Sequence, residues 1–359
     1  MAHAEHCMDA ETFLSAARES VVLDVRSPSE HAQGHLPGAI SFPLFLDEER
    51  AVVGKTYKQV GQTEAIETGL GIVGPKLQAL ANRARELFDA QASPKPLLLY
   101  CWRGGMRSGS VDWLLRTAGI PTVLCDGGYK ACRSHFIHVL ETPRPYVVVG
   151  GMTGSAKTEV LHALHHQEAQ VLDLEGLAKH FGSAFGNLEA HAQPSTEQFT
   201  NLLAWQLMAL DKEATARPIW VEDESRQIGR IHVPEMFHKR LREAPVLELE
   251  RTEEDRVSHL LSMYGDASSE ALIEAFERIR DKLGGQHAQA AVAHVKEGDL
   301  AAAARIALVY YDKTYRYGLN QRDLMRAVNA RGLTPDAVAT LCRRIHNEWN
   351  PWKLPQTSN

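Results

Sequence analysis

A cysteine stands at the end of an apolar run, where the chain turns through two glycines into a helical pattern. The apolar run is 97–100, the cysteine is Cys101, and the helix is expected to begin near Arg107. Backbone N–H groups of such a loop can surround the sulfur, and the positive end of the helix dipole favours a thiolate. The guanidinium groups of Arg103 and Arg107 add positive charge, so the pKa of the thiol should fall below its free value of about 8.5. We predict a nucleophilic Cys101 with Arg103 and Arg107 as catalytic partners; the alternative is an inert cysteine on a core strand.

A second candidate site is a glycine-rich stretch that directly follows another apolar run. Residues 151–158 read Gly-Met-Thr-Gly-Ser-Ala-Lys-Thr and come after the strand-like residues 146–150. The pattern resembles a P-loop, in which backbone amides cradle phosphate oxygens, a lysine neutralises them and a hydroxyl reaches Mg²⁺. The alternative is a glycine-rich turn that binds nothing. The predicted phosphate-binding residues are Gly151, Thr153, Gly154, Ser155, Ala156, Lys157, Thr158 and, further along the chain, Arg226.

Ala156 departs from the P-loop pattern, because it occupies the position of the last glycine. Its methyl group lies where the backbone must come closest to the anion. We therefore expect anion binding to survive, whereas efficient nucleotide hydrolysis is in doubt.

Acidic residues end a further apolar run, at the place where a Walker B segment would lie. Glu222 and Asp223 follow the run 218–221, and either could orient a metal ion or a water molecule. The alternative is a solvated acidic strand end, which is common. Arg226 follows at the carboxyl end of the same predicted strand, where doubly wound sheets bind their ligands.

The last part of the chain is basic although the whole protein is acidic. Residues 301–359 hold nine Lys and Arg against four Asp and Glu, whereas the net charge of the chain is −6. Aromatic and basic residues alternate here, and stacking surfaces beside cations suit an RNA loop with unstacked bases. The alternative is a helix whose tyrosines pack inward. The predicted RNA contacts are Tyr310, Lys313, Tyr315 and Arg316.

Length and composition restrict the class of protein. A chain of 359 residues exceeds what one core usually supports, so we expect two domains. The composition, 44% hydrophobic and 23% charged, is that of a globular protein, and no apolar run approaches 20 residues, so we expect no membrane span. Five cysteines at irregular spacings indicate reduced thiols, and because the first ten residues are polar we expect no signal peptide there. We therefore expect a cytoplasmic protein.

Strands and helices are predicted to alternate along the chain. Helices are expected at 75–90 and 106–118, and strands at 122–125 and 247–249, with mainly helix from Glu253 onward. Residues 44–74 are expected to form a long polar connection at the rim of the substrate site. Such alternation implies parallel sheets with helices on both faces. A proline-rich linker at 141–145 separates the two predicted domains.

The first part of the chain resembles the rhodanese-like sulfurtransferases. The Cys101 loop is preceded by a series typical of them, namely Asp24-Val25-Arg26, Glu30, Gly34-His35-Leu36-Pro37-Gly38-Ala39 and Phe42-Pro43. The resemblance implies a persulfide, or its selenium counterpart, held on Cys101. A large soft anion of this kind requires a ring of N–H donors.

The whole chain resembles the tRNA 2-selenouridine synthase family, on the Cys101 loop, residues 151–158 and residues 222–229. The resemblance implies a rhodanese-like parallel-sheet domain at 1–141, a P-loop NTPase-like α/β domain at 142–300, and a helical, basic region at 301–359 that packs on the second domain. It also implies that selenium from selenophosphate replaces the 2-thio sulfur of wobble uridine, through an S-geranyl intermediate made from geranyl diphosphate. Cys101 would carry the selenium or otherwise direct the exchange.

The family resemblance sets further expectations about ligands and partners. The P-loop would hold geranyl diphosphate or selenophosphate as a co-substrate, with Mg²⁺ as an optional ion and no tightly bound organic cofactor. The partner is the anticodon arm of tRNA, and a monomer would suffice. Two alternatives remain: a sulfurtransferase with a regulatory P-loop domain, and a small-molecule kinase or NTPase fused to a rhodanese module.

Overall fold

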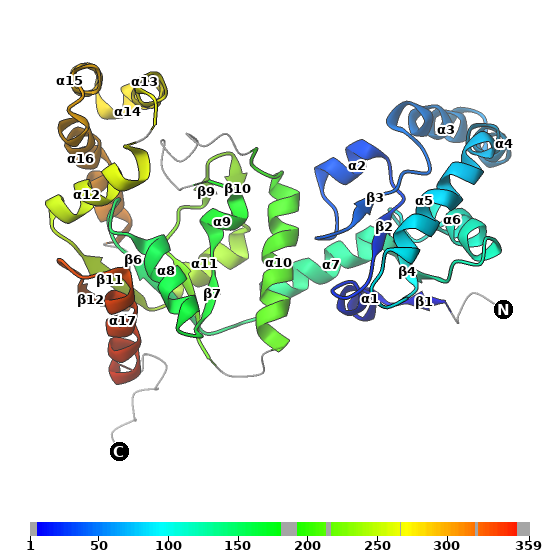
Figure 1. Cartoon of the computed structure of the whole chain (residues 1–359), viewed down its shortest axis with the longest axis horizontal. Coiled ribbons are helices and arrows are strands. Elements are labelled where there is room, and N and C mark those ends of the chain that lie inside the picture. Colours follow the sequence, from blue (N-terminus) through cyan, green and yellow to red (C-terminus); the bar gives the residue numbers. More distant parts are fainter. Residues whose placement is uncertain (1–5, 181–191, 213–216, 266, 320–321, 350–359) are drawn as a thin grey trace. The chain divides into compact units, whose positions relative to one another are not determined.

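The protein is described by a computed structural model that covers residues 6–180, 192–212, 217–265, 267–319 and 322–349, without the side chains of residues 212, 314 and 316–319. The chain forms two compact units, 1–140 with 200–205 and 141–199 with 206–359. Each unit has its own five-stranded sheet with helices around it (Figure 1). The expected α/β fold class is therefore confirmed.

The sheet of the first unit is parallel throughout and has the order β1-β5-β4-β2-β3. Its central strand β4 carries four apolar or aromatic side chains that are all buried, which explains the uninterrupted apolar run before Cys101. Cys101 thus lies at the carboxyl end of a strand that has neighbours on both sides. The strands are β1 (Cys7–Met8), β2 (Val22–Asp24), β3 (Ile40–Ser41), β4 (Leu97–Tyr100) and β5 (Thr122–Cys125).

Helices surround this sheet, and two of them lie where a polar connection was expected. Residues 44–74 contain α3 and α4, so that prediction was wrong. No residue of α3 is buried, and in α4 only Ala65, Gly69 and Val73 are, so the stretch lacks a buried apolar face that the sequence could reveal. The helices are α1 (Ala10–Ala16), α2 (Pro28–Gln33), α3 (Asp47–Gln59), α4 (Gln62–Val73), α5 (Leu77–Asp89), α6 (Met106–Thr117) and α7 (Gly128–Glu141), with a 3-10 turn at Gly74–Lys76.

The sheet of the second unit is also parallel and has the order β12-β11-β6-β8-β7. Its edge strand β12 comes from the C-terminal region, where the sequence predicted mainly helix. Only one of its five residues is buried, so the strand lacks an apolar pattern that the sequence could reveal. The strands are β6 (Tyr146–Gly150), β7 (Gln170–Leu172), β8 (Ile219–Glu222), β11 (Val246–Glu250) and β12 (Met325–Asn329), beside a hairpin of β9 (Gln227–Ile228) and β10 (Ile231–His232).

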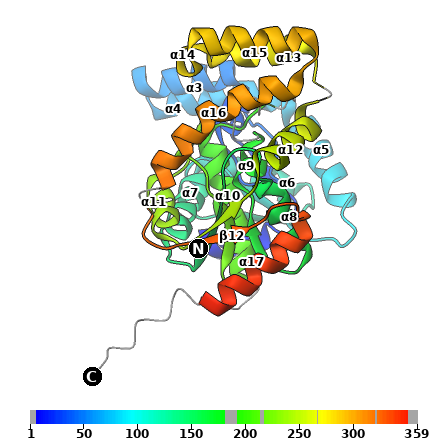
Figure 2. The ribbon, with the colours of Figure 1, turned by 90° about the vertical axis from the view of Figure 1, so that its left-hand side faces the viewer.

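Two groups of helices can be distinguished in the second unit. In the first group, α8 and α17 pack together on the sheet; in the second, α12 to α16 form a helical cluster (Figures 1 and 2). The cluster has its own apolar core, around Phe276 and the alanines of α15 and α16. The helices are α8 (Lys157–His166), α9 (Leu174–Ala178), α10 (Thr196–Lys212), α11 (Glu235–Glu243), α12 (Glu253–Tyr264), α13 (Ser269–Arg278), α14 (Arg280–Leu283), α15 (Gly285–Glu297), α16 (Leu300–Leu319) and α17 (Pro335–Trp349).

No helix within the described residues is long and apolar enough to pass through a bilayer.

Candidate functional site

Cys101 lies between strand β4 and helix α6, with its sulfur surrounded by donors from its own loop. The N–H of Gly105 lies 3.3 Å from Sγ, and the hydroxyl of Ser108 donates to Sγ at 3.2 Å. The residue is 3% exposed. The loop thus offers hydrogen bonds to a sulfur anion, as predicted for a nucleophilic cysteine.

Hydrogen bonds lower the pKa of Cys101 below its ordinary value. Burial alone would raise this pKa, but it is outweighed by the Ser108 hydroxyl and by the backbone N–H groups of Ser108, Arg103 and Gly105. The sequence predicted both loop N–H groups and guanidinium charges as the cause, and the contacts to the sulfur here are hydrogen bonds. Arg107 donates to Glu30 at 2.7 Å, and Arg103 acts on the sulfur through its backbone N–H. The charge of Arg107 is therefore largely balanced by a carboxylate.

The ion pair between Arg107 and Glu30 ties the start of α6 to α2. Burial would raise the pKa of Glu30, but Arg107 outweighs burial and holds this pKa below its usual range. Arg107 is 23% exposed and Glu30 15%, so solvent weakens the pair only partly. We assign Arg107 a positioning role, because it fixes the first turn of the helix that carries Ser108.

Other cysteines lack the donors that surround Cys101. Burial raises the pKa of the Cys342 thiol to about 12 and also raises that of Cys7. The sulfurs of Cys125 and Cys132 lie 3.4 Å apart, and this contact together with burial raises the pKa of Cys125. Thiol-specific reagents at neutral pH should therefore react preferentially with Cys101 once they reach it.

Replacing Ser108 with alanine should raise the pKa of Cys101 and slow its alkylation near neutral pH. A lowered pKa keeps the thiolate populated at lower pH, so losing the strongest lowering contact shifts the rate profile to higher pH. We expect about a tenfold slower reaction with iodoacetamide at pH 7, which corresponds to a shift of about one pKa unit. Ser110→Ala is the control, because this hydroxyl donates to Met106 O on the same helix. Equal profiles for Ser108→Ala and the wild type would contradict the assignment.

A close backbone contact fixes the shape of the cysteine loop. Gly128, at the start of α7, has φ +60°, and a Cβ there would lie 2.4 Å from Cys101 O and from Gly104 N. Next to it, the N–H groups of Tyr129 and Lys130 donate to the carbonyls of Cys101 and Trp102 at 2.8 and 3.0 Å. Only glycine allows this approach, so the glycine pair at 127–128 supports the loop from outside.

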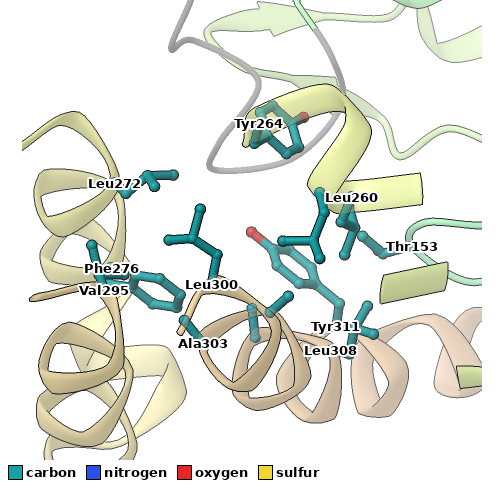
Figure 3. A pocket seen from close by; sticks show the side chains of 13 residues that line it. Thr153, Leu260, Tyr264, Leu272, Phe276, Val295, Leu300, Ala303, Leu308 and Tyr311 are labelled. Carbon is teal, nitrogen blue, oxygen red and sulfur yellow. The ribbon is translucent and has the colours of Figure 1, made fainter. Parts of the chain in front are cut away.

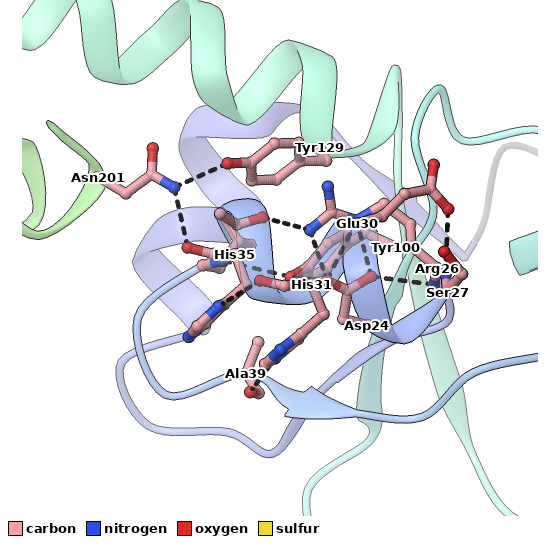
Figure 4. A network of polar contacts seen from close by, with 12 residues as sticks. Asp24, Arg26, Ser27, Glu30, His31, His35, Ala39, Tyr100, Tyr129 and Asn201 are labelled. Carbon is pink, nitrogen blue, oxygen red and sulfur yellow. Dashed lines mark hydrogen bonds and ion pairs between the residues drawn. The ribbon is translucent and has the colours of Figure 1, made fainter. Parts of the chain in front are cut away.

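A buried polar network supports the strand beside Cys101 (Figure 4). Arg26 donates to Asp24 Oδ2 at 2.6 Å and to Gly34 O at 2.6 Å, and the Tyr100 hydroxyl donates to Asp24 Oδ2 at 2.8 Å. The Tyr100 hydroxyl in turn accepts from the N–H of Leu36. Asp24 and Arg26 are 0% and 1% exposed, so each compensates the buried charge of the other. The Asp-x-Arg motif therefore acts by holding loops in place.

Aromatic and amide groups extend this network towards α10. The guanidinium carbon of Arg26 lies 3.9 Å from the ring centroid of Tyr129. The side-chain amide of Asn201 donates to the Tyr129 hydroxyl at 2.8 Å and to His35 O at 3.0 Å (Figure 4). Sequence reasoning missed Asn201, because a lone asparagine in a helix usually faces solvent.

A large cavity opens beside the cysteine loop. Its volume is about 1200 Å³, and the loop residues Gly104 and Gly105 form part of its wall. Apolar side chains from α3, α4 and α6 form much of the remainder, among them Val53, Leu70 and Trp113. The surface beside the sulfur can therefore receive a group with substantial apolar area.

In the second unit, the glycine-rich loop joins β6 to α8, as predicted for a phosphate-binding loop. Arg256 Nε donates to Thr153 O at 2.8 Å, and Arg251 Nε donates to Ser155 O at 3.0 Å. Because peptide groups are planar and trans, the N–H groups of Gly154 and Ala156 point away from these guanidiniums. The hydroxyl of Ser155 is buried without a hydrogen-bond partner, and a buried polar group in this state favours a ligand.

Lys157 and acidic side chains lie together at the start of α8. Lys157 Nζ donates to Gly151 O at 3.0 Å, and the Thr158 hydroxyl donates to Glu175 Oε2 at 2.9 Å. Glu222 is fully buried and accepts from Glu175 N at 2.8 Å, while its other oxygen has no partner. Burial, helped by Asp173 and Glu175, raises the pKa of Glu222 to about 8. Glu222 therefore holds a proton at neutral pH and can donate a hydrogen bond.

Asp223 and Arg226 point to other partners. Asp223 forms an ion pair with Arg322, which is 1% exposed, and Arg242 lies 4.0 Å from it. Arg226 donates to Glu235 at 3.0 Å at the surface. Asp223 thus anchors the buried arginine that precedes β12, and Arg226 pairs with Glu235 of α11.

Ala156 adopts the left-handed backbone conformation that glycine prefers. Its φ is +63° and its ψ +39°, and it is 7% exposed. A side chain in this region costs roughly 1–2 kcal/mol. The strain lies directly before Lys157, at the position where the P-loop pattern has glycine.

Replacing Ala156 with glycine should stabilise the second unit by about 1 kcal/mol, because relief of the left-handed strain exceeds the entropy that glycine gains in the unfolded chain. Urea unfolding of the full chain measures this. Ala163→Gly, in the interior of α8, is the matched control and should destabilise by about 1 kcal/mol. A lower midpoint for Ala156→Gly would show that the methyl group contributes more through packing than it costs in strain.

The predicted RNA-contact residues on α16 are placed differently from one another. Tyr315 is largely buried, and its hydroxyl accepts from Gly151 N at 2.6 Å. Tyr310 packs against the core of the helical cluster. Lys313 is exposed, and the side chain of Arg316 lies outside the described residues. Of the two interpretations left open, inward packing describes the two tyrosines.

Arg256 lies on α12 and contacts the glycine-rich loop, a role that sequence reasoning missed. Its guanidinium pairs with Asp312 of α16 and is 6% exposed, while its Nε supports Thr153 O. No local pattern pointed to this role, because Thr153 and Asp312 are far from Arg256 in the sequence. Arg256 and Tyr315 together connect the glycine-rich loop to α12 and α16.

In the described part of the chain, no group of three or more His, Cys, Asp or Glu side chains could hold a metal ion. Thr158 of the loop and its partner Glu175 carry side-chain oxygens, the type of ligand that Mg²⁺ prefers. Mg²⁺ commonly binds through one or two protein oxygens together with substrate phosphates. A phosphorylated ligand could therefore bring the ion with it.

Comparison with known proteins agrees with the two units. Residues 144–347 match the family model described as the tRNA 2-selenouridine synthase AAA domain, and residues 9–135 match the rhodanese-like domain. The first match covers more than half of the chain.

Three relatives named tRNA 2-selenouridine synthase align with the chain. The Nitrosomonas europaea protein is 38% identical over 68% of this chain and 64% of its own length. The Marinobacter nauticus protein is 36% identical over 88% of this chain and 92% of its own length. The Bdellovibrio bacteriovorus protein is 34% identical over 84% of this chain and 89% of its own length. With this identity across both units, the chain belongs to the tRNA 2-selenouridine synthase family.

Proposed function

We propose that this protein replaces the sulfur at C2 of wobble 2-thiouridine in tRNA by selenium, in two steps that use geranyl diphosphate and selenophosphate. The relatives carry the name of a tRNA 2-selenouridine synthase, which supports selenation of tRNA. The observation that carries the proposal is Cys101, a cysteine of lowered pKa held by N–H and hydroxyl donors beside a cavity with apolar walls. The anticodon arm is the proposed RNA substrate, with Lys313 and Arg316 as candidate phosphate contacts.

In the first step, the glycine-rich loop holds the diphosphate while the tRNA sulfur is alkylated. The sulfur at C2 attacks C1 of the geranyl group, the C1–O bond breaks, and diphosphate leaves. The base loses the proton from N3, so the S-geranyl product is neutral. Lys157 and the loop N–H groups would stabilise the charge on the leaving diphosphate. Mg²⁺, when bound beside Thr158, would neutralise part of the same charge.

In the second step, Cys101 acts as a covalent catalyst at C2. Its thiolate adds to C2 and expels geranylthiolate, which takes up a proton and leaves the base joined to Sγ. The selenium of selenophosphate then attacks C2, Cys101 leaves as thiolate, and water cleaves the Se–P bond to give selenouridine and phosphate. No electrons are gained or lost overall. A perselenide on Cys101 would need an oxidant, because the thiolate sulfur and the selenium of selenophosphate are both fully reduced.

Nucleoside mass spectrometry of 2-thiouridine tRNA tests the proposal by omission of one donor at a time. Geranyl diphosphate alone should give S-geranyl-2-thiouridine, and addition of selenophosphate should convert it to 2-selenouridine with release of geranylthiol. Selenophosphate alone should give no product. Transfer of thiosulfate sulfur to cyanide without any change in the tRNA would instead identify a sulfurtransferase, and phosphate release from ATP on addition of a metabolite would identify a kinase or NTPase.

A further inference from the structure

The cavity of the first unit begins one hydrogen bond away from the reactive sulfur. Gly105 is part of its wall, and the N–H of Gly105 lies 3.3 Å from Cys101 Sγ. The cavity volume of about 1200 Å³ exceeds the range of roughly 300–1,000 Å³ for small-ligand sites. A substrate whose reacting carbon meets Cys101 therefore has the substituent on that carbon next to a space large enough to hold it.

Large apolar side chains are exposed around this cavity. Tyr57 of α3, Leu70 of α4, and Met106 and Trp113 of α6 all line it, and they are between 58% and 66% exposed. A group of exposed apolar side chains at one place marks a surface that binds an apolar ligand or partner. Another wall residue, Phe45, is buried and belongs to the core of the unit. The walls are thus apolar from the core to the surface.

Glycines keep part of this space open beside the cysteine loop. Gly105 and Gly109 both line the cavity, and a Cβ built at either position would meet nothing within 4 Å. Glycine inside a helix is destabilising relative to alanine, and neither close packing nor a left-handed backbone requires it at Gly109. Room for a ligand is a physical reason for glycine at this position.

We propose that this cavity holds the geranyl chain of S-geranyl-2-thiouridine while Cys101 acts on C2 of the base. The inference rests on the proposed function, which supplies the substrate, and it adds where the chain lies and what the chain does. The chain is joined to the sulfur on C2, so it lies close to Sγ whenever C2 does. Its burial removes apolar surface from water and holds C2 at Cys101. The geranyl group thus serves for recognition as well as for departure of the sulfur.

A second apolar space, beside the glycine-rich loop, is too small for this chain. It lies between Thr153 and side chains of α12, α13, α15 and α16, such as Phe276 and Leu300 (Figure 3). Its volume is about 60 Å³, which equals that of about two water molecules in the liquid. Most of its lining belongs to the core of the helical cluster. We therefore place the chain in the cavity of the first unit.

Titration calorimetry with modified nucleosides measures this recognition without turnover. The full chain with Cys101→Ala, which has no nucleophile for C2, is titrated with S-geranyl-2-thiouridine and with S-ethyl-2-thiouridine. The geranyl nucleoside should bind at least about a hundredfold more tightly, because its longer chain removes more apolar surface from water. Equal affinities for the two nucleosides would overturn the cavity assignment.

The substitution Gly109→Leu, added to Cys101→Ala, places a side chain in the cavity. Its Cβ meets open space and leucine favours a helix, so the fold should persist. The preference for the geranyl nucleoside should fall by at least about tenfold, while S-ethyl-2-thiouridine binds as before. Gly71→Leu is the matched control, because Gly71 is an exposed glycine of α4 with open space at its Cβ and is not part of the cavity wall. It should keep the preference.

A second variant keeps the inference testable if Gly109→Leu fails to fold. Leu70→Asn removes an exposed part of the apolar wall and should lower the preference by at least about threefold. Val60→Asn is its control, because Val60 is 67% exposed and is not part of the wall. A preference that neither Gly109→Leu nor Leu70→Asn changes would show that the chain lies elsewhere.

The outcomes separate this inference from the proposed function. If geranylated tRNA is converted to 2-selenouridine while the two nucleosides bind equally, the proposed function stands and this inference fails. If the preference for the geranyl nucleoside falls in the cavity variants but geranylated tRNA is not selenated, the inference stands and the second step of the proposed function fails.

Discussion

Replacing Cys101 with alanine is expected to abolish formation of 2-selenouridine, by at least about a hundredfold, while S-geranylation continues at close to the wild-type rate. The reason is that alanine has no nucleophile for C2, whereas alkylation of the tRNA sulfur uses the sulfur itself and the diphosphate loop. S-geranyl-2-thiouridine should therefore accumulate in the presence of both donors. Nucleoside mass spectrometry over time measures both products in one sample.

Cys7→Ala is the matched control for this substitution. Cys7 is an exposed thiol with a raised pKa, so its loss should leave both products unchanged. A covalent adduct gives a second readout: with S-geranyl tRNA and no selenophosphate, the wild type should yield an RNA–protein species on a denaturing gel and release geranylthiol. Full selenation by Cys101→Ala would remove Cys101 from the mechanism.

Replacing Lys157 with alanine should have the opposite effect, with loss of S-geranylation by about a hundredfold or more. Lys157 is the cation of the glycine-rich loop; burial raises the pKa of Glu175 and of Glu224, and the charge of Lys157 opposes this shift. Without its ammonium group the leaving diphosphate loses charge stabilisation. Initial rates of S-geranylation at saturating tRNA measure the loss.

Lys239→Ala serves as the control for Lys157→Ala, because Lys239 is 67% exposed on α11 and pairs only loosely with Glu243 at 3.9 Å. It should leave the rate of S-geranylation unchanged. If Lys157→Ala geranylates tRNA as fast as the wild type, the glycine-rich loop does not hold the diphosphate of the donor.

The two strands that end at the cysteine loop and at the glycine-rich loop could be predicted from the sequence, because buried parallel strands are continuous apolar runs. The runs before Cys101 and before Gly151 were recognised for this reason, and both are followed by the predicted loops and helices. The strand β12 could not be recognised, because an edge strand with one buried residue has no apolar pattern. Residues 44–74 were misjudged because α3 and α4 bury little surface and contain several glycines.

Contacts between residues that are far apart in the chain could not be predicted from the sequence. Arg107 was predicted to act on the sulfur because it is close to Cys101 in the sequence. In the structure it forms an ion pair with Glu30, which lies on a separate helix. Tyr315 was assigned to RNA, but its hydroxyl contacts Gly151, 164 positions away. Arg256 carried no signal, since its partners Thr153 and Asp312 are far from it in sequence. The environment of a side chain could be predicted where its neighbours in the sequence determine it. It could not be predicted where the contacting residue comes from another helix or strand.

The central claim is that two chemical sites act in order on one base, the glycine-rich loop first and Cys101 second. It is tested most directly by giving tRNA that already carries S-geranyl-2-thiouridine, with selenophosphate, to the Lys157→Ala and Cys101→Ala variants. The account predicts that Lys157→Ala forms 2-selenouridine at close to the wild-type rate and that Cys101→Ala forms none. Selenation by Cys101→Ala, or failure of Lys157→Ala to use the geranylated tRNA, would contradict it.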